Sequence, residues 1–188
     1  MSIHKKLYSL PSEVSLPPGY SIRKTFKKDA KVLRDLINGY LSKFEVRAHF
    51  TKKDVEHWFS YRAEIIECFV VLDENKKITD LFSFYNLPSS ISGHKKYKEL
   101  KAAYAYYLIP QKLTMKQLVS ACMITAKEKG YDVFNMLDIM DNSQVFSDLL
   151  FSKGDGFLQY YFYNWDLKKK VLHPNEIGIV LMLSLIHI

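Results

Sequence analysis

Side chains that commonly act as nucleophiles, bases or metal ligands are scattered along this chain. Four histidines have neither metal-ligand spacing nor a paired serine or cysteine nucleophile: His49, His57, His94 and His173. The two cysteines, Cys68 and Cys122, also lack the spacing of a metal site or a disulfide. The sequence therefore indicates neither a metal centre nor a covalent nucleophile, and unpaired cysteines favour a reducing, intracellular compartment.

Four other features have residue types that suit a binding site. Asn135 lies in a strand-like run, where asparagine is depleted, so a site role gains weight. Gly154-Asp155-Gly156 forms a turn that exposes its backbone, which serves a tight bend and a bound ligand equally well. Ser89 and Tyr104 each have a structural alternative, as a turn residue and as a core residue of a strand.

Segments of strand-like and helical pattern must position these residues. Helices are expected at 29–44, 51–59, 114–129 and 142–151, with Thr51 and Thr114 as N-caps and Gly130 closing the third helix. Strands are expected at 19–25, 65–72, 78–87, 101–109, 131–139, 157–165 and 177–183. The aromatic run at 157–165 could stack on nucleic-acid bases, but alternate burial of a strand explains it more simply.

The expected order, β-α-α-β-β-β-α-β-α-β-β, predicts a single α/β domain with a mixed sheet flanked by helices. This order resembles the GNAT (acyl-CoA N-acyltransferase) superfamily. That superfamily cradles the CoA pyrophosphate with a glycine-bearing loop between its fourth strand and third helix. Here the junction, "YLIPQKLTMKQ" (107–117), has no glycine, and Pro110 lacks an N–H. The fold is thus acyltransferase-like, whereas an acyl-CoA site is not expected.

Several linked motifs, in order and spacing, resemble the C-terminal half of eukaryotic protein N-myristoyltransferase (glycylpeptide N-tetradecanoyltransferase). They are "KLYSLP", "DVEHWF", "ITDLFSFYNLPSS", "LKAAYAYY", "KGYDVFNMLDIMDN", "KGDGFLQYYFYNW" and "IGIVLM". The resemblance covers 6–182 and implies one N-myristoyltransferase C-terminal domain, with 183–188 as an extension outside the family pattern.

The resemblance implies an enzyme built from two GNAT-like halves. The N-terminal half binds myristoyl-CoA and supplies the oxyanion hole, and the C-terminal half forms much of the peptide groove. Myristate moves to the amino group of an N-terminal glycine by direct attack on the thioester. An N-terminal amine has a pKa of about 7.7–8 and must first lose a proton. In this family the base is the free C-terminal carboxylate, whose pKa burial raises.

The motif matches carry the family's site residues onto this chain. Met182 occupies the position of the C-terminal carboxylate base. The positions matching the peptide-binding residues lie in the groove, in the glycine turn and near the reacting amine: Ser89, Tyr104, Asn135, Leu137, Asp155, Gly156, Leu158 and Leu181. The chain departs from the family at Leu150 and Ser152, where a lysine and an extra glycine are usual.

Two departures bear on activity. The acyl-CoA half does not precede this segment, so we expect this half to bind no cofactor, with myristoyl-CoA as the co-substrate of the full enzyme. Six residues, "LSLIHI", follow Met182, and an amide carbonyl there cannot accept the proton. We therefore expect the chain alone to be inactive, and interpret the extension as an artefact of the gene model or transcript, or as a feature that disables catalysis.

Composition limits the expected partners. The net charge is +7, but the lysines form short groups typical of solvated faces, and no motif indicates specific nucleic-acid binding. The apolar tail 177–188 is shorter than the roughly 20 residues of a membrane span. We expect a cytoplasmic protein whose partners are N-terminal glycine peptides and the missing N-terminal half, with ribosome association left open. A non-catalytic peptide-binding or regulatory module, and a basic RNA- or ribosome-contacting domain, are the alternatives.

Overall fold

A computed structural model describes residues 9–154, 156–167 and 171–181. Its centre is a five-stranded sheet in the order β1-β3-β4-β7-β8. The bounds are β1 Ser21–Lys24, β3 Ile66–Leu72, β4 Ile78–Asn86, β7 Ala102–Ile109 and β8 Val133–Asn135. Neighbouring strands are antiparallel except β7 and β8, which are parallel. The mixed sheet predicted from the sequence is therefore confirmed.

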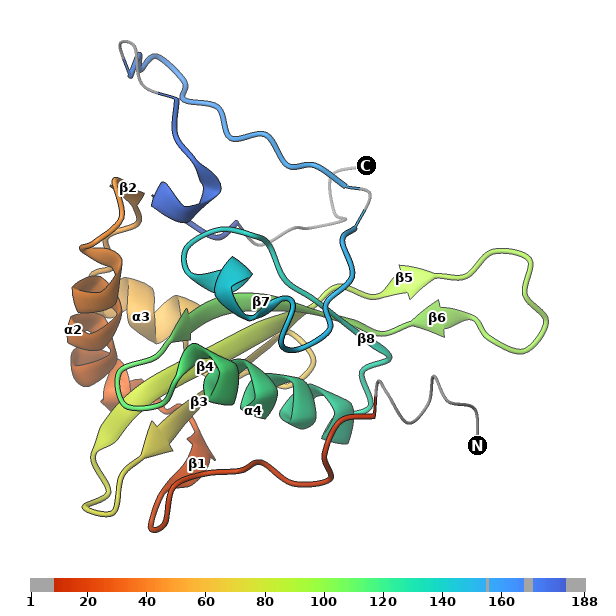
Figure 1. Ribbon diagram of the computed structural model, residues 1–188, viewed down its shortest axis with the longest axis horizontal. Coiled ribbons are helices and arrows are strands. Elements are labelled where there is room, and N and C mark those ends of the chain that lie inside the picture. The colour runs from red at the N-terminus through yellow and green to blue at the C-terminus, as the bar shows by residue number, and fades with distance from the viewer. Residues whose placement is uncertain (1–8, 155, 168–170, 182–188) are drawn as a thin grey trace.

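Helices cover both faces of this sheet, as Figure 1 shows for α4 across the front and α2 and α3 on the left. One core cluster joins α2 (Ala30–Leu41) and α3 (Lys52–Trp58) to the sheet, and a second joins α4 (Met115–Glu128) to the opposite face. Every residue of β3 is buried, as expected for a strand covered on both sides. The predicted caps are confirmed, because Thr51 and Thr114 accept N–H groups at the starts of α3 and α4.

Short elements complete the chain. A 3₁₀ turn, η1 (Lys27–Asp29), precedes α2, and two others lie later in the chain: η2 (Asn142–Val145) and η3 (Pro174–Glu176). A small antiparallel pair, β5 (Ser89–Ser90) and β6 (Glu99–Leu100), forms the arm that projects on the right of Figure 1. Near the C-terminus, β9 (Ile177–Gly178) pairs in parallel with β2 (Val46–Arg47), which follows α2.

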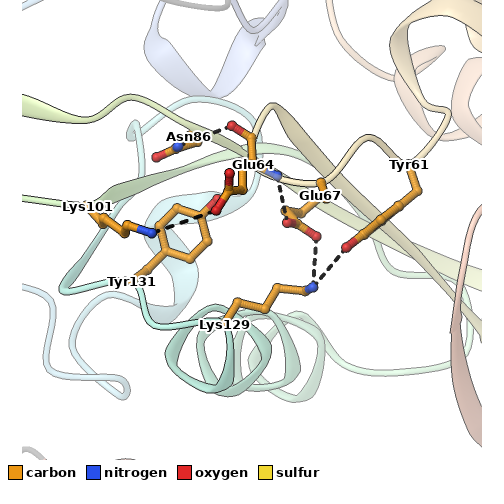
Figure 2. Close-up of a pocket in the computed structure, with 8 residues that line it drawn as sticks. Tyr61, Glu64, Glu67, Asn86, Lys101, Lys129 and Tyr131 are labelled. Atoms are coloured by element: carbon orange, nitrogen blue, oxygen red, sulfur yellow. Dashed lines mark hydrogen bonds and ion pairs between the residues drawn. The ribbon is translucent and has the colours of Figure 1, made fainter.

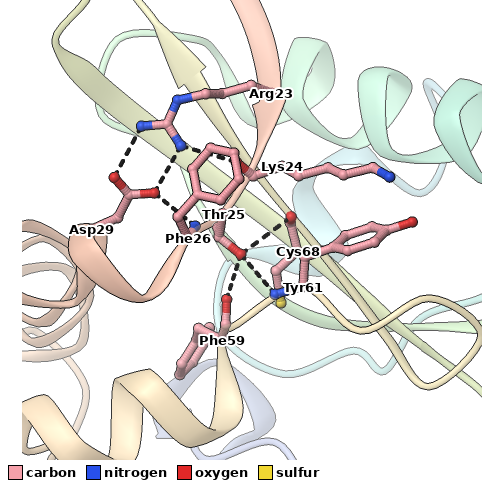
Figure 3. A network of polar contacts seen from close by, with 8 residues as sticks. All are labelled: Arg23, Lys24, Thr25, Phe26, Asp29, Phe59, Tyr61 and Cys68. Carbon is pink, nitrogen blue, oxygen red and sulfur yellow. Dashed lines mark hydrogen bonds and ion pairs between the residues drawn. The ribbon is translucent and has the colours of Figure 1, made fainter.

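A buried threonine ties β1 to the start of β3 (Figure 3). The hydroxyl of Thr25 donates to the carbonyl of Phe59 at 2.6 Å and accepts the N–H of Tyr61 at 3.0 Å. The backbone N–H of Thr25 donates to the carbonyl of Cys68 at 3.1 Å. Beside it, Arg23 makes a two-pronged ion pair with Asp29 at 2.7 and 3.0 Å. The bonds of Thr25 hold the end of α3 against the edge of the sheet, and the ion pair holds η1 beside β1.

The last third of the chain differs from the prediction. Residues 157–165 form no strand and run as a loop away from the sheet (Figure 1), and the rings of Tyr161, Tyr163 and Trp165 are 87, 88 and 78% exposed. The prediction of alternate core packing is therefore wrong. The pattern of a strand is present, but a strand also needs a neighbour for its hydrogen bonds, and the described residues provide none.

Three further elements are shorter than expected. The strand predicted at 131–139 is β8, which has only three residues. The helix predicted at 142–151 is η2 followed by turns, and Leu150 in those turns has a φ of 57°. The strand predicted at 177–183 is paired over only two residues, Ile177 and Gly178. Its final residues, 182 and 183, lie outside the described residues. The described part of the chain contains no helix that is both long and apolar enough to cross a membrane.

Candidate functional site

The loop between β7 and α4 is filled by a side chain of the protein itself. The backbone N–H groups of Gln111, Lys112 and Leu113 donate to one carboxylate oxygen of Asp80, at 2.7, 2.9 and 2.9 Å. Asp80 is fully buried near the start of β4. Converging backbone N–H groups in a loop that leads into a helix can cradle a phosphate. In this chain the three N–H groups are bonded to an oxygen of the protein's own Asp80 side chain.

The structure brings two predicted site residues together at the edge of the sheet. Tyr104 in β7 and Asn135 in β8 are direct partners in the parallel ladder. The ring of Tyr104 stacks on Tyr85 of β4, with centroids 5.5 Å apart. Leu137 lies just beyond β8. It is half-buried and packs, like Tyr104, against the core cluster between the sheet and helices α2 and α3, and its carbonyl accepts a hydrogen bond from the side-chain amide of Asn142 at 2.9 Å. Tyr104 and Asn135 therefore lie side by side, with Leu137 two residues further along the chain, and their role in peptide binding stays a prediction.

The other predicted site residues lie on the surface or outside the described part of the chain. Ser89 is exposed on β5, in the projecting arm. Gly156, Leu158 and Leu181 are also exposed. Asp155 and Met182, the predicted turn residue and the predicted base position, lie outside the described residues, as does the extension 183–188.

The segment that leads to residue 182 is held by contacts that sequence reasoning missed. The N–H of Val180 donates to the hydroxyl of Tyr107 at 3.1 Å, and the hydroxyl of Tyr160 donates to the carbonyl of Ile179 at 3.0 Å. Gly178 lies against Phe44, so close that a Cβ there would be 2.9 Å from the ring. Burial raises the pKa of Tyr107 to about 12, so its hydroxyl is neutral at physiological pH.

A small cavity of about 270 Å³ lies beside the start of β7, at Lys101 (Figure 2). Its wall includes Glu67, which is only 3% exposed and pairs with Lys129 at 3.2 Å. Lys129 also donates to the hydroxyl of Tyr61 at 3.0 Å. Burial by itself lowers the pKa of Lys129, but the bond to Tyr61 and the charge of Glu67 outweigh it and raise that pKa. The opposite charges satisfy each other, and none of the predicted site residues lines this cavity.

The described part of the chain contains no candidate metal site. No group of three or more histidine, cysteine, aspartate or glutamate side chains there could hold a metal ion. Cys68 and Cys122 are free and buried, and burial raises the pKa of both thiols.

Comparisons with known proteins agree with this architecture. A model of the family "Myristoyl-CoA:protein N-myristoyltransferase, C-terminal domain" matches residues 1–180. A glycylpeptide N-tetradecanoyltransferase of Dictyostelium discoideum is 44% identical over 179 residues, which are 94% of this chain and 42% of that protein. Glycylpeptide N-tetradecanoyltransferase 1 of Arabidopsis thaliana is 42% identical over 183 residues, covering 97% of this chain and 41% of that protein. The chain thus spans less than half the length of these curated relatives.

Solved structures give the same result. The Saccharomyces cerevisiae N-myristoyltransferase with bound myristoyl-CoA superposes with a TM-score of 0.75 and 31% identity, over 81% of this chain and 39% of that one. Glucosamine-6-phosphate N-acetyltransferase from Arabidopsis thaliana superposes with a TM-score of 0.56 and 18% identity, over 77% of this chain and 99% of that one. This second likeness shows the fold alone, and it confirms the predicted GNAT-like architecture.

Proposed function

The chain belongs to the family of myristoyl-CoA:protein N-myristoyltransferase C-terminal domains, and on that premise we propose that it is the peptide-binding half of a glycylpeptide N-tetradecanoyltransferase. The observation that carries the proposal is the family match over residues 1–180, nearly the whole chain. The complete enzyme transfers myristate from myristoyl-CoA to the N-terminal glycine of a protein. Tyr104, Asn135 and Leu137 form one part of the peptide groove that this half contributes.

The proposed chemistry needs a base at the end of the last strand. The base takes a proton from the glycine ammonium, and the neutral amine then attacks the thioester carbonyl. The C–S bond breaks, and CoA leaves as a thiolate that takes the second proton of the amine. The base is the carboxylate of a chain that ends at Met182, the residue after Leu181. Two buried contacts support this arrangement, because Val180 and Gly178 are packed into the core just before that position.

Myristoyl-CoA binding is assigned to the partner half rather than to this one. In support, the loop that cradles phosphate in GNAT enzymes has its N–H groups bonded to Asp80. The exposed aromatics of 157–165 are the proposed contact surface for that partner half, since several large exposed apolar side chains follow one another in this segment. The reaction takes place in the cytoplasm, where free cysteines stay reduced.

Reconstitution tests the proposal. The 188-residue chain and a version ending at Met182 are each purified alone and each co-expressed with the N-terminal half of the Dictyostelium relative. Myristoyl-CoA and a peptide with N-terminal glycine are added, and the acylated peptide is measured by mass spectrometry. We expect product only when the version ending at Met182 is combined with the acyl-CoA half.

The remaining outcomes separate the alternatives. The 188-residue chain in the same combination is the matched control, and it is expected to bind the peptide without acylating it. Product from either version alone would contradict the assignment of myristoyl-CoA to the partner half. Peptide binding without product in every combination, with both halves shown to associate, would favour the non-catalytic module.

A further inference from the structure

We propose that Tyr107 is the positioning residue for the C-terminal segment 177–181, and that a β-bulge in β7 turns its side chain toward that segment. The structural part of this proposal concerns only contacts within this chain. The catalytic part rests on the proposed function, in which the residue after Leu181 is the base. The inference therefore has a structural test and a kinetic test that can fail separately.

The bulge is visible in the pairing of β4 with β7. Phe82 pairs with Leu108 and Phe84 with Ala105, so the single residue Ser83 stands opposite both Tyr106 and Tyr107. The hydroxyl of Ser83 fills the gap in the ladder. It donates to the carbonyl of Tyr107 and accepts the N–H of Tyr107, both at 3.0 Å. An extra residue of this kind locally re-aims side chains.

The side-chain directions along β7 change at this point. In a regular strand, consecutive residues point to opposite faces. Tyr106 and Tyr107 nevertheless belong to the same core cluster, the one that also contains Val180. Without the bulge, Tyr107 would face α4 on the other side of the sheet. With it, the phenol lies among the residues that pack against the C-terminal segment, where its oxygen accepts the N–H of Val180.

The contacts of the segment fix its register as well as its place. Tyr107 holds the N–H of Val180 and Tyr160 holds the carbonyl of Ile179, which are atoms of neighbouring residues. Gly178 meets the ring of Phe44 where a side chain would collide. A shift by one residue would place an isoleucine against that ring and reverse the side-chain faces of the segment. The register therefore determines where the chain emerges after Leu181.

The catalytic consequence follows from the distances that proton transfer tolerates. A general base must lie within hydrogen-bond reach of its proton, and misplacement by about 1 Å can cost on the order of a hundredfold in rate. Tyr107 touches the segment at Val180 and acts on the reaction through it. We therefore expect the Tyr107→Phe variant to lower kcat about tenfold or more, and to leave KM for the peptide within about twofold.

The structural test is amide hydrogen exchange of the full 188-residue chain, read at single residues. In Tyr107→Phe, the N–H of Val180 loses its acceptor, and its exchange is expected to accelerate about tenfold or more while β3 and β4 stay protected. Tyr106→Phe is the matched control, because it alters the neighbouring buried tyrosine of the same bulge. It is expected to leave the exchange of Val180 unchanged.

Each outcome decides the proposal. Unchanged exchange of Val180 in Tyr107→Phe overturns it, whatever the enzyme does. If that variant fails to fold, Ser83→Ala is used instead, because it removes the hydroxyl that fills the bulge at Tyr107, and unchanged exchange of Val180 again overturns the proposal. In the reconstituted enzyme ending at Met182, faster exchange with unchanged kcat confirms the contact and overturns its catalytic consequence. If the reconstituted wild type is inactive, the proposed function fails, and the exchange result alone decides the structural inference.

Discussion

Replacing Asp80 with alanine is expected to lower the free energy of unfolding by about 3 kcal/mol. The substitution removes the acceptor of three backbone N–H groups at once. Leu113 is buried, so its N–H would be left without an acceptor and shielded from water, which destabilises the fold by about 2 kcal/mol. Gln111 and Lys112 are exposed, so water can replace the carboxylate and each loses only about 0.5 kcal/mol.

Urea unfolding at 25 °C, followed by circular dichroism, measures this loss. Asp73→Ala is the matched control, because one oxygen of Asp73 also accepts two backbone N–H groups, from Asn75 and Lys77, but in an exposed hairpin turn. It is expected to cost less than about 1 kcal/mol. Asp80→Asn keeps an acceptor without the charge and should fall between the two. If Asp80→Ala costs no more than Asp73→Ala, the explanation of the β7–α4 loop as a filled anion cradle is wrong.

Three other predictions use the same protein. Gly178→Ala should lower the free energy of unfolding in urea by about 1–3 kcal/mol, because the new Cβ would lie 2.9 Å from a phenylalanine ring. Gly39→Ala, on α2 with open space around it, should instead raise that free energy by about 0.5–1 kcal/mol, and equal changes in the two variants would contradict the predicted clash. The two buried cysteines should resist iodoacetamide at pH 8 in the folded chain and react in urea, and rapid labelling of the native protein in mass spectrometry would count against their burial. Burial acts to raise the pKa of Asp29, but its bonds from Arg23 and a backbone N–H prevail and lower it. The stability it contributes is therefore present above about pH 4 and lost as the pH falls through the lowered pKa. Arg23→Met should destabilise clearly at pH 7 and much less at pH 2, and an equal loss at both pH values would exclude the ion pair as the cause.

The sequence predicted correctly where two helices begin, because neighbouring residues determine a helix N-terminus. Thr51 and Thr114 are followed by a side chain that completes a capping box, and both helices begin there. The prediction is wrong at 157–165, where the aromatic residues alternate as in a strand but form none. Alternation describes what a strand buries, but pairing requires another strand, and the sequence of one segment does not contain that information.

The candidate site was predictable to a smaller extent. The motifs led to Tyr104 and Asn135, which the structure places side by side. Asp80 was missed because its partners lie some thirty positions further along the chain, and no local pattern links a strand carboxylate to a loop N–H. Tyr107 had a weak signal, since two adjacent tyrosines in "AYAYYLI" interrupt the alternation expected of a regular strand.

The carboxylate of Asp80 also affects how the stability of this domain responds to its surroundings. A loop whose N–H groups bind a dissolved anion gains stability with the logarithm of that anion's concentration, so the domain becomes sensitive to the supply of its ligand. A covalently attached anion has a fixed effective concentration, and its occupancy does not vary with metabolism. The contribution of this loop to stability should therefore not depend on the concentration of any dissolved anion, because the acceptor belongs to the same chain.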